Sequence, residues 1–134
     1  MKRVLLIEDD EAIRTVLSEV LRHGGFEVMT ASDGKEGIEL FEKQDLDFVI
    51  TDLFMPTLDG AETIIAIRRL RPNFKILAIS GGRRIIGPEH LESVVRHMGG
   101  NHFLAKPFTS EQLLTMVQDL LSSPNQPTEP ASCS

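Results

Sequence analysis

Short apolar runs alternate with longer segments of helical spacing along most of the chain, and this alternation constrains the fold more than any other feature. The runs are RVLLI (3–7), FEVMT (26–30), DFVIT (47–51), KILAIS (75–80) and HFLA (102–105). Strands that alternate with helices form βαβ units, which require a parallel sheet with helices on both faces. We therefore predict an α/β fold built on a doubly wound, five-stranded parallel sheet.

Apolar spacing between these runs predicts the helices. In the first, Ile13, Val16, Leu17, Val20 and Leu21 are spaced as one buried stripe that ends at Gly24-Gly25. The others are marked by Ile38 and Phe41 after Asp33-Gly34; by Ala61, Ile64 and Ile65 before the pre-proline Arg71; by Leu91, Val94, Val95 and Met98; and by Leu113, Leu114, Val117 and Leu120 over residues 110–121, with Thr109 as N-cap. The strand segments VLLI and ILAI lack alternation, as expected for strands covered on both faces.

The composition indicates one acidic globular domain. The chain has 134 residues, of which 41% are hydrophobic, and this suffices for a core of ordinary size. A net charge of −6 argues against nucleic acid or an anionic membrane as the main partner. The single cysteine, Cys133, can form no internal disulfide, and neither a membrane span nor a signal peptide is expected, so we predict a cytoplasmic location. Residues 1–121 form the predicted domain, and the Pro/Ser-rich residues 122–134 form a predicted disordered tail.

Polar side chains follow the predicted strands where their carboxyl ends would meet. Glu8, Asp9 and Asp10 follow the first strand, and Asp52 follows the third. Ser80 ends the fourth strand, and Lys106 comes just after the fifth. In open α/β sheets the functional crevice lies beyond these carboxyl ends, so we expect a site that combines carboxylates, a hydroxyl and an ammonium group.

The acidic residues at this edge suit a divalent cation. Two carboxylates ~5 Å apart repel each other by roughly 3 kcal/mol at an effective dielectric constant of 20, and a cation would relieve that repulsion. Oxygen ligands with room for water favour Mg²⁺, whose open positions can take phosphate oxygens. Phosphoryl transfer needs positive charge around the phosphoryl oxygens, which Mg²⁺ and Lys106 would supply, with Asp52 as the nucleophile.

Four motifs, LLIEDDE, VITDLFMPTLDG, AISG and HFLAKPF, occur in this order, and together they resemble the receiver domain of two-component response regulators. The resemblance covers residues 2 to about 121. It implies a flavodoxin-like (βα)5 fold with strand order 2-1-3-4-5. It also implies a single-domain response regulator that is a signalling protein rather than an enzyme, although it catalyses its own phosphorylation and dephosphorylation. A histidine kinase or a histidine phosphotransfer protein would donate the phosphoryl group.

The resemblance also assigns roles to individual residues. It implies that Glu8 and Asp9 are the acidic pair of the Mg²⁺ site, with Asp9 the more direct ligand, and that Asp52 is the phosphorylated residue and a further ligand. The carbonyl of Phe54 would complete the metal site, while Ser80 and Lys106 would bind phosphoryl oxygens. Phe103 would be the aromatic switch residue paired with Ser80, and Lys106-Pro107 a cis peptide. The resemblance implies a downstream protein target but does not identify it. It leaves open whether phosphorylation produces a homodimer.

Each of these residues also has a simpler interpretation. The acids after the first strand could be a charged helix start, Asp52 a helix cap, and Lys106 a solvated side chain. Phe103 could be an ordinary core residue. The four histidines, His23, His90, His97 and His102, lack metal-ligand spacing and are interpreted as surface or interface residues. The basic residues Arg68, Arg69 and Arg71 are expected to complement a helix C-terminus, and Arg83 and Arg84 to lie in a solvated loop.

The sequence departs from the family at two places, and three other functions are alternatives to the one that the resemblance implies. The segment GGRRIIGPE (81–89) lengthens the interval between Ser80 and Lys106, and its Ile85 and Ile86 suggest a contact site. The bulky Phe54 is expected to screen an aspartyl phosphate from water. A haloacid dehalogenase-like phosphatase would need an aspartate where Phe54 stands, and an FMN-binding flavodoxin would not place acids after its first strand. A pseudo-receiver that only docks partners stays open.

Overall fold

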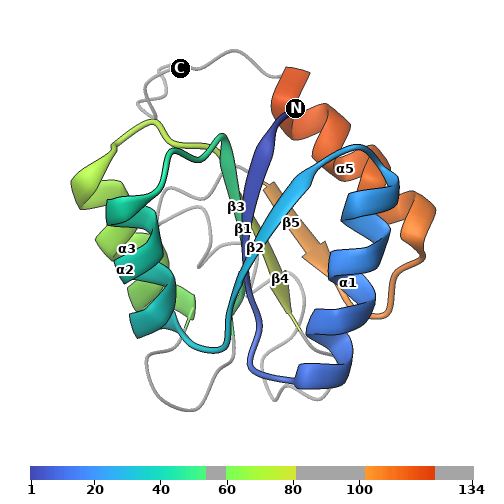
Figure 1. The fold of residues 1–134 in the computed structure, drawn as a ribbon, viewed down its shortest axis with the longest axis horizontal. Helices are drawn as coiled ribbons and strands as arrows, with labels where there is room; N and C mark the ends of the chain where they lie inside the picture. Colours follow the sequence, from blue (N-terminus) through green and yellow to red (C-terminus); the bar gives the residue numbers. More distant parts are fainter. Residues whose placement is uncertain (54–59, 81–101, 123–134) are drawn as a thin grey trace, which may run out of the picture.

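The fold is a parallel five-stranded sheet with the strand order β2-β1-β3-β4-β5 (Figure 1). A computed structural model of the protein describes residues 1–53, 60–80 and 102–122. The strands are β1 Arg3–Ile7, β2 Glu27–Ala31, β3 Phe48–Asp52, β4 Ile76–Ser80 and β5 His102–Ala105. The predicted α/β class and strand order are therefore confirmed. β2 and β3 lie one residue later than predicted, and β4 begins one residue later, so Asp52 is the last residue of its strand.

Helices cover both faces of the sheet. They are α1 Glu11–His23, α2 Gly34–Lys43, α3 Gly60–Leu70 and α5 Ser110–Ser122. Figure 1 shows α2 and α3 against one face and α1 and α5 against the other. α5 includes Ser122, which was assigned to the tail. The helix predicted around Leu91–Met98 and the rest of the predicted tail lie outside the described residues.

The central strands supply the core on both faces. In β1, Leu5 and Ile7 pack toward α2 and α3, while Val4 and Leu6 pack toward α1 and α5, and all four are fully buried. Successive side chains of a strand point to opposite faces, so a strand covered on both sides has no polar position. The interpretation of the unbroken apolar runs is thus confirmed. Across the described residues, no helix combines the length and apolarity that crossing a bilayer requires.

The predicted stripe on α1 is wrong at one position. Val16 is 60% exposed, whereas Ser18 is only 4% exposed and faces the core beside Leu17 and Leu21. Each helical residue is rotated by about 100° from the last, so a stripe centred on Leu17, Ser18 and Leu21 leaves Val16 on the far side. The buried face of α3 also differs from the predicted one: Ile65, which was predicted to be buried, is 40% exposed, whereas Ile67 is fully buried.

Side-chain caps fix where the helices begin. Asp10 caps α1 by accepting a hydrogen bond from the backbone N–H of Ile13 at 3.1 Å. Thr109 caps α5 as predicted: its Oγ1 accepts from the N–H of Gln112 at 3.0 Å, and the Gln112 side chain accepts from the N–H of Thr109 at 2.8 Å. Asp10 therefore has a structural role as the N-cap, which agrees with the interpretation of the acids after the first strand as a charged helix start.

Gly37 lets α2 approach the sheet closely. A Cβ at this position would clash first with Cδ1 of Ile7 and would also lie 2.8 Å from its Cγ1, and Ile7 is fully buried. Alanine normally favours a helix interior over glycine by about 1 kcal/mol, but overpacking a core costs ~1–3 kcal/mol. We expect Gly37→Ala to lower the free energy of unfolding by about 1–2 kcal/mol in urea titrations.

Gly24 provides the matched control for this prediction. A Cβ there would meet Cδ2 of Leu114, also at 2.8 Å. That atom is the end of a half-buried side chain that can rotate away, so Gly24→Ala should cost less than Gly37→Ala. Trimming Ile7 to valine should reduce the penalty of Gly37→Ala. Equal stabilities for Gly37→Ala and the wild type would contradict the steric explanation.

Candidate functional site

Strand register brings two of the predicted acids side by side. β1 and β3 are adjacent and parallel, with Ile7 opposite Thr51. Glu8, the residue after Ile7, therefore lies beside Asp52, the last residue of β3. Both acids are buried, with exposed fractions of 1% for Glu8 and 5% for Asp52. Buried carboxylates require a partner, because burial without one is costly.

Lys106 provides that partner from the end of β5. Its Nζ lies 3.2 Å from Oδ2 of Asp52 and 3.3 Å from Oε1 of Glu8, and its side chain is 18% exposed. The ammonium thus bridges residues that precede it by 54 and 98 positions. A solvated lysine would reach neither of these carboxylates, so the simpler interpretation of Lys106 is excluded. The peptide between Lys106 and Pro107 is cis, as the resemblance implied.

Burial and charge shift the protonation of this cluster. Burial, followed by the neighbouring charge of Asp52, raises the pKa of Glu8 from its ordinary 4.5 to about 7. Burial alone would lower the pKa of Lys106, but Asp52 and Glu8 together raise it above its ordinary value. The lysine therefore stays charged, and one positive charge faces two buried acids.

The donor set fits a hard divalent cation. Glu8, Asp9 and Asp52 each offer a carboxylate oxygen, and these atoms lie within 4.8 Å of one another. Asp9 is exposed, so the cluster can be reached from solvent. Ligands that are all oxygen suit Mg²⁺. A divalent cation beside Lys106 would also balance the charge of Asp52, which adds to burial in raising the pKa of Glu8.

The loop from β1 to α1 is held by hydrogen bonds at Glu8. The N–H of Glu8 donates to the carbonyl of Ala31 at 3.0 Å, and Oε2 of Glu8 accepts from the N–H of Asp10 at 3.2 Å. Nη1 of Arg14 donates to the carbonyl oxygen of Glu8 at 2.8 Å. Arg14 was not among the predicted site residues, although a basic residue in the first turns of a helix that follows an acidic loop was a usable signal.

The sequence model of the response regulator receiver domain family matches residues 4–118. This chain belongs to that family. The receiver is 34% identical to the CAI-1 autoinducer sensor kinase/phosphatase CqsS of Vibrio cholerae over 116 residues, which are 87% of the chain and 17% of CqsS. It is 30% identical to the alkaline phosphatase synthesis transcriptional regulatory protein PhoP of Bacillus subtilis, covering 90% of the chain and 48% of PhoP. The chain thus spans less than half the length of either relative.

Solved receivers have the same fold. Chemotaxis protein CheY4 of Vibrio cholerae superposes with a TM-score of 0.82 at 32% identity, covering 90% of this chain and 99% of CheY4. Response regulator TrrA of Thermotoga maritima, in complex with Mg²⁺ and BeF, superposes with a TM-score of 0.79 at 29% identity, covering 90% and 100% of the two chains. The family is one of signalling proteins in two-component systems.

Not every predicted site residue of this receiver falls in the described part of the chain. Phe54 and the segment 81–89 lie outside it, and of Ser80 only the backbone, at the end of β4, is described. Phe103 is half-buried and packs against the core on the α2 and α3 side, next to Ala78. This packing suits both a core residue and a switch, so the predicted switch role stays a prediction.

One basic residue, Arg71, differs from its predicted setting, and one histidine is more buried than a surface side chain would be. Arg68 donates to the carbonyls of Pro72 and Phe74 just beyond α3, as a residue complementing a helix C-terminus should. Arg71 instead lies over the rings of Phe41 and Phe74, at 5.6 and 5.8 Å from their centroids. His102 was interpreted as a surface or interface residue; its side chain is only 16% exposed, and its Nε2 lies 2.9 Å from Asp119 of α5.

Proposed function

We propose that this receiver accepts a phosphoryl group on Asp52 in a Mg²⁺-dependent reaction. The observation that supports this function best is the convergence of three carboxylates with the Lys106 ammonium, which lies 3.2 Å from Asp52. The donor would be the phosphohistidine of a histidine kinase or of a histidine phosphotransfer protein. Its sequence similarity to sensor kinases such as CqsS fits a place in such a pathway.

Each residue would have a distinct role in the transfer. A carboxylate oxygen of Asp52 attacks the phosphorus atom, the bond from phosphorus to the histidine nitrogen breaks, and the electron pair returns to the imidazole. The Lys106 ammonium, which contacts Asp52 before the transfer, would then bind a phosphoryl oxygen. The Ser80 hydroxyl would donate to another phosphoryl oxygen. Glu8, Asp9, Asp52 and the Phe54 carbonyl would hold Mg²⁺, which when bound neutralises the acids and offers open positions to phosphoryl oxygens.

The phosphorylated state would change which partner the receiver binds, or pass the phosphoryl group onward. The new dianion at the edge of the sheet is a large local change in charge, and Ser80 and Phe103 are the residues that would couple it to the surface. Hydrolysis of the aspartyl phosphate by the receiver itself would end the signal. The downstream target is a protein, since the acidic chain does not favour nucleic acid or membrane surfaces.

The test is to incubate the protein with acetyl phosphate, with and without Mg²⁺, and to measure its intact mass. We expect one phosphoryl adduct that forms with Mg²⁺ and is lost in Asp52→Asn. Asp45→Asn is the matched control, because Asp45 is an exposed acid at the opposite end of β3. An adduct retained in Asp52→Asn would refute the assignment, and no adduct under any condition would favour a pseudo-receiver.

A further inference from the structure

Arg14 contacts the acidic loop from the first turns of α1. Its Nη1 donates to the carbonyl oxygen of Glu8 at 2.8 Å, a short distance typical of a charge-assisted hydrogen bond. The carbonyl lies one residue beyond the end of β1, and the side chain of Arg14 is half-buried there. The helix thereby holds the strand end that carries the acids.

The bonded carbonyl belongs to the peptide that joins Glu8 to Asp9. A peptide unit is planar, so fixing its oxygen also fixes the direction in which the chain leaves toward Asp9. The N–H of Glu8 is already bonded to Ala31 of β2 at 3.0 Å. With Arg14 on the carbonyl, both backbone polar groups of Glu8 have partners, and the loop has one orientation.

Asp9 depends on this backbone more than Glu8 does. The Glu8 side chain is held by Lys106 and by the N–H of Asp10. Among the residues that the structure describes, none donates a hydrogen bond to the Asp9 carboxylate. Its place within 4.8 Å of the Glu8 and Asp52 oxygens is therefore set by the backbone that leads to it.

We propose that Arg14 is a positioning residue for the acidic site, which holds the peptide between Glu8 and Asp9 so that Asp9 faces Asp52. The proposal rests on the Mg²⁺ site described under the proposed function. The hydrogen bond of Arg14 and its positive charge are expected to have opposite effects on Mg²⁺ affinity. The positive charge of Arg14 opposes binding of a cation nearby, so removing only its charge would strengthen Mg²⁺ binding, whereas removing its hydrogen bond would weaken it.

The experiment measures Mg²⁺ affinity of the full chain by isothermal titration calorimetry, without a phosphodonor. Arg14→Met removes the donor and keeps an apolar stem of similar length. Arg22→Met is the matched control: it removes the same charge from an exposed residue in the last turn of α1. We expect Arg14→Met to weaken Mg²⁺ binding about 10-fold, as is usual when a residue that orients a metal ligand is lost, and Arg22→Met to change it less than twofold.

A double-mutant cycle with Asp9→Asn tests whether Arg14 affects Mg²⁺ binding through Asp9. If Arg14 acts through Asp9, Arg14→Met should weaken Mg²⁺ binding much less in the Asp9→Asn background than in the wild type. Unchanged or tighter binding by Arg14→Met would overturn the proposal, as would full additivity in the cycle. If Arg14→Met does not fold, Arg14→Leu, which also lacks a donor, is judged by the same criteria. If neither folds in saturating Mg²⁺, Arg14 serves the fold rather than the site, and the proposal is overturned.

The wild-type titration separates this proposal from the one on which it rests. Absence of Mg²⁺ binding by the wild type would refute the proposed function. Normal binding by the wild type, together with unchanged binding by Arg14→Met, would refute the role of Arg14 alone.

Discussion

Replacing Lys106 with methionine is expected to lower the free energy of unfolding by about 3–5 kcal/mol at pH 8 in the absence of Mg²⁺. Lys106 is the cation that lies between Glu8 and Asp52, at 3.3 and 3.2 Å. Methionine has a similar unbranched length but no charge, so two buried carboxylates would face each other without compensation. Breaking a buried ion pair by removing one partner is costly for this reason.

Conditions that restore a positive charge or remove a negative one should reduce this cost. Saturating Mg²⁺ should recover much of the lost stability, because the cation would take over the compensation of the acids. Lower pH should also reduce the loss, because Glu8 binds a proton more readily than an ordinary carboxyl group. Urea titrations at pH 5.5 and pH 8, with and without Mg²⁺, measure both effects.

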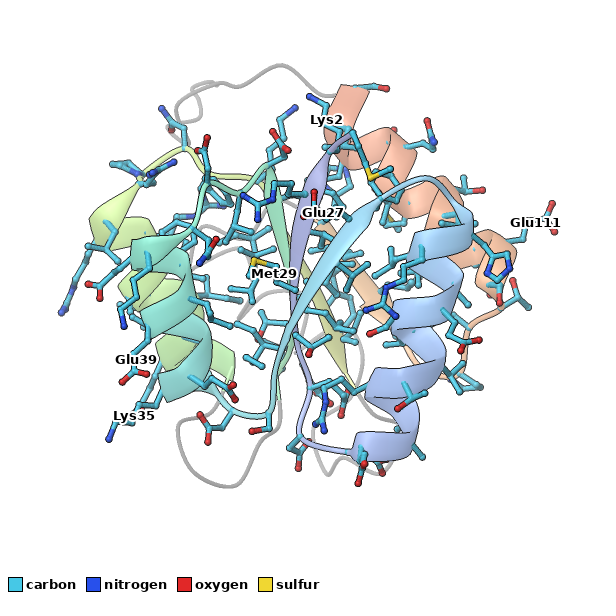
Figure 2. All side chains as sticks on the ribbon, in the orientation of Figure 1. Lys2, Glu27, Met29, Lys35, Glu39 and Glu111 are labelled. Carbon is cyan, nitrogen blue, oxygen red and sulfur yellow. The ribbon has the colours of Figure 1, made fainter. Side chains whose placement is uncertain are left out.

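Lys35→Met is the matched control for Lys106→Met. Lys35 lies on α2 and projects into solvent, as Figure 2 shows, and the substitution removes the same charge. An exposed lysine contributes little to stability, so its loss should cost less than about 1 kcal/mol. Similar costs for the two substitutions would mean that the buried bridge contributes nothing particular to the fold.

The wild-type protein is expected to lose roughly 3 kcal/mol of stability relative to Glu8→Gln as the pH rises from 4.5 to 7 in Mg²⁺-free buffer. Burial and the charge of Asp52 raise the pKa of Glu8 to about 7 in the folded protein, from 4.5 in the unfolded chain. Between these values the folded state binds the proton that the unfolded state has released. Stability contributed by that proton is present below pH 4.5 and is lost by about pH 7.

The comparison with Glu8→Gln centres on this titration, because glutamine does not titrate and groups remote from Asp52 and Lys106 contribute equally to both proteins. Above pH 7 the difference between the two should stay constant. Saturating Mg²⁺ should reverse the trend for the wild type, since the ion binds the deprotonated acid. A difference between the two proteins that does not vary with pH would contradict the raised pKa of Glu8.

Much of the fold could be predicted because it depends on local order. Unbroken apolar runs identified β1 and β4, and the motif around Thr109 identified the start of α5. The face that a helix turns to the sheet was less predictable. Val16 and Ser18 occupy the opposite places to those that hydrophobicity favours, because the orientation of α1 is set by all its contacts with the sheet and α5.

Among the described site residues, the sequence predicted that Glu8, Asp9, Asp52 and Lys106 would meet, but not their burial and charge interactions. The acids and the lysine stand at strand ends, and parallel strands bring such ends to one edge. That reasoning could not show that Glu8 is more buried than Asp9, or that Lys106 contacts both Glu8 and Asp52. Arg14 was not predicted either, because a basic residue in the first turns of α1 does not by itself show which backbone carbonyl its side chain reaches.

The sequence by itself determined the order of the elements, the residues at the strand ends and the family motifs that they form. These features depend on spacing along the chain, where hydrophobic periodicity and turn chemistry act. Only the tertiary structure decided which charges meet, since Lys106 reaches Glu8 across 98 positions and Asp52 across 54. Sheet order, register and burial set those distances, and with them the shifted pKa of Glu8 and the support that Arg14 gives to the loop.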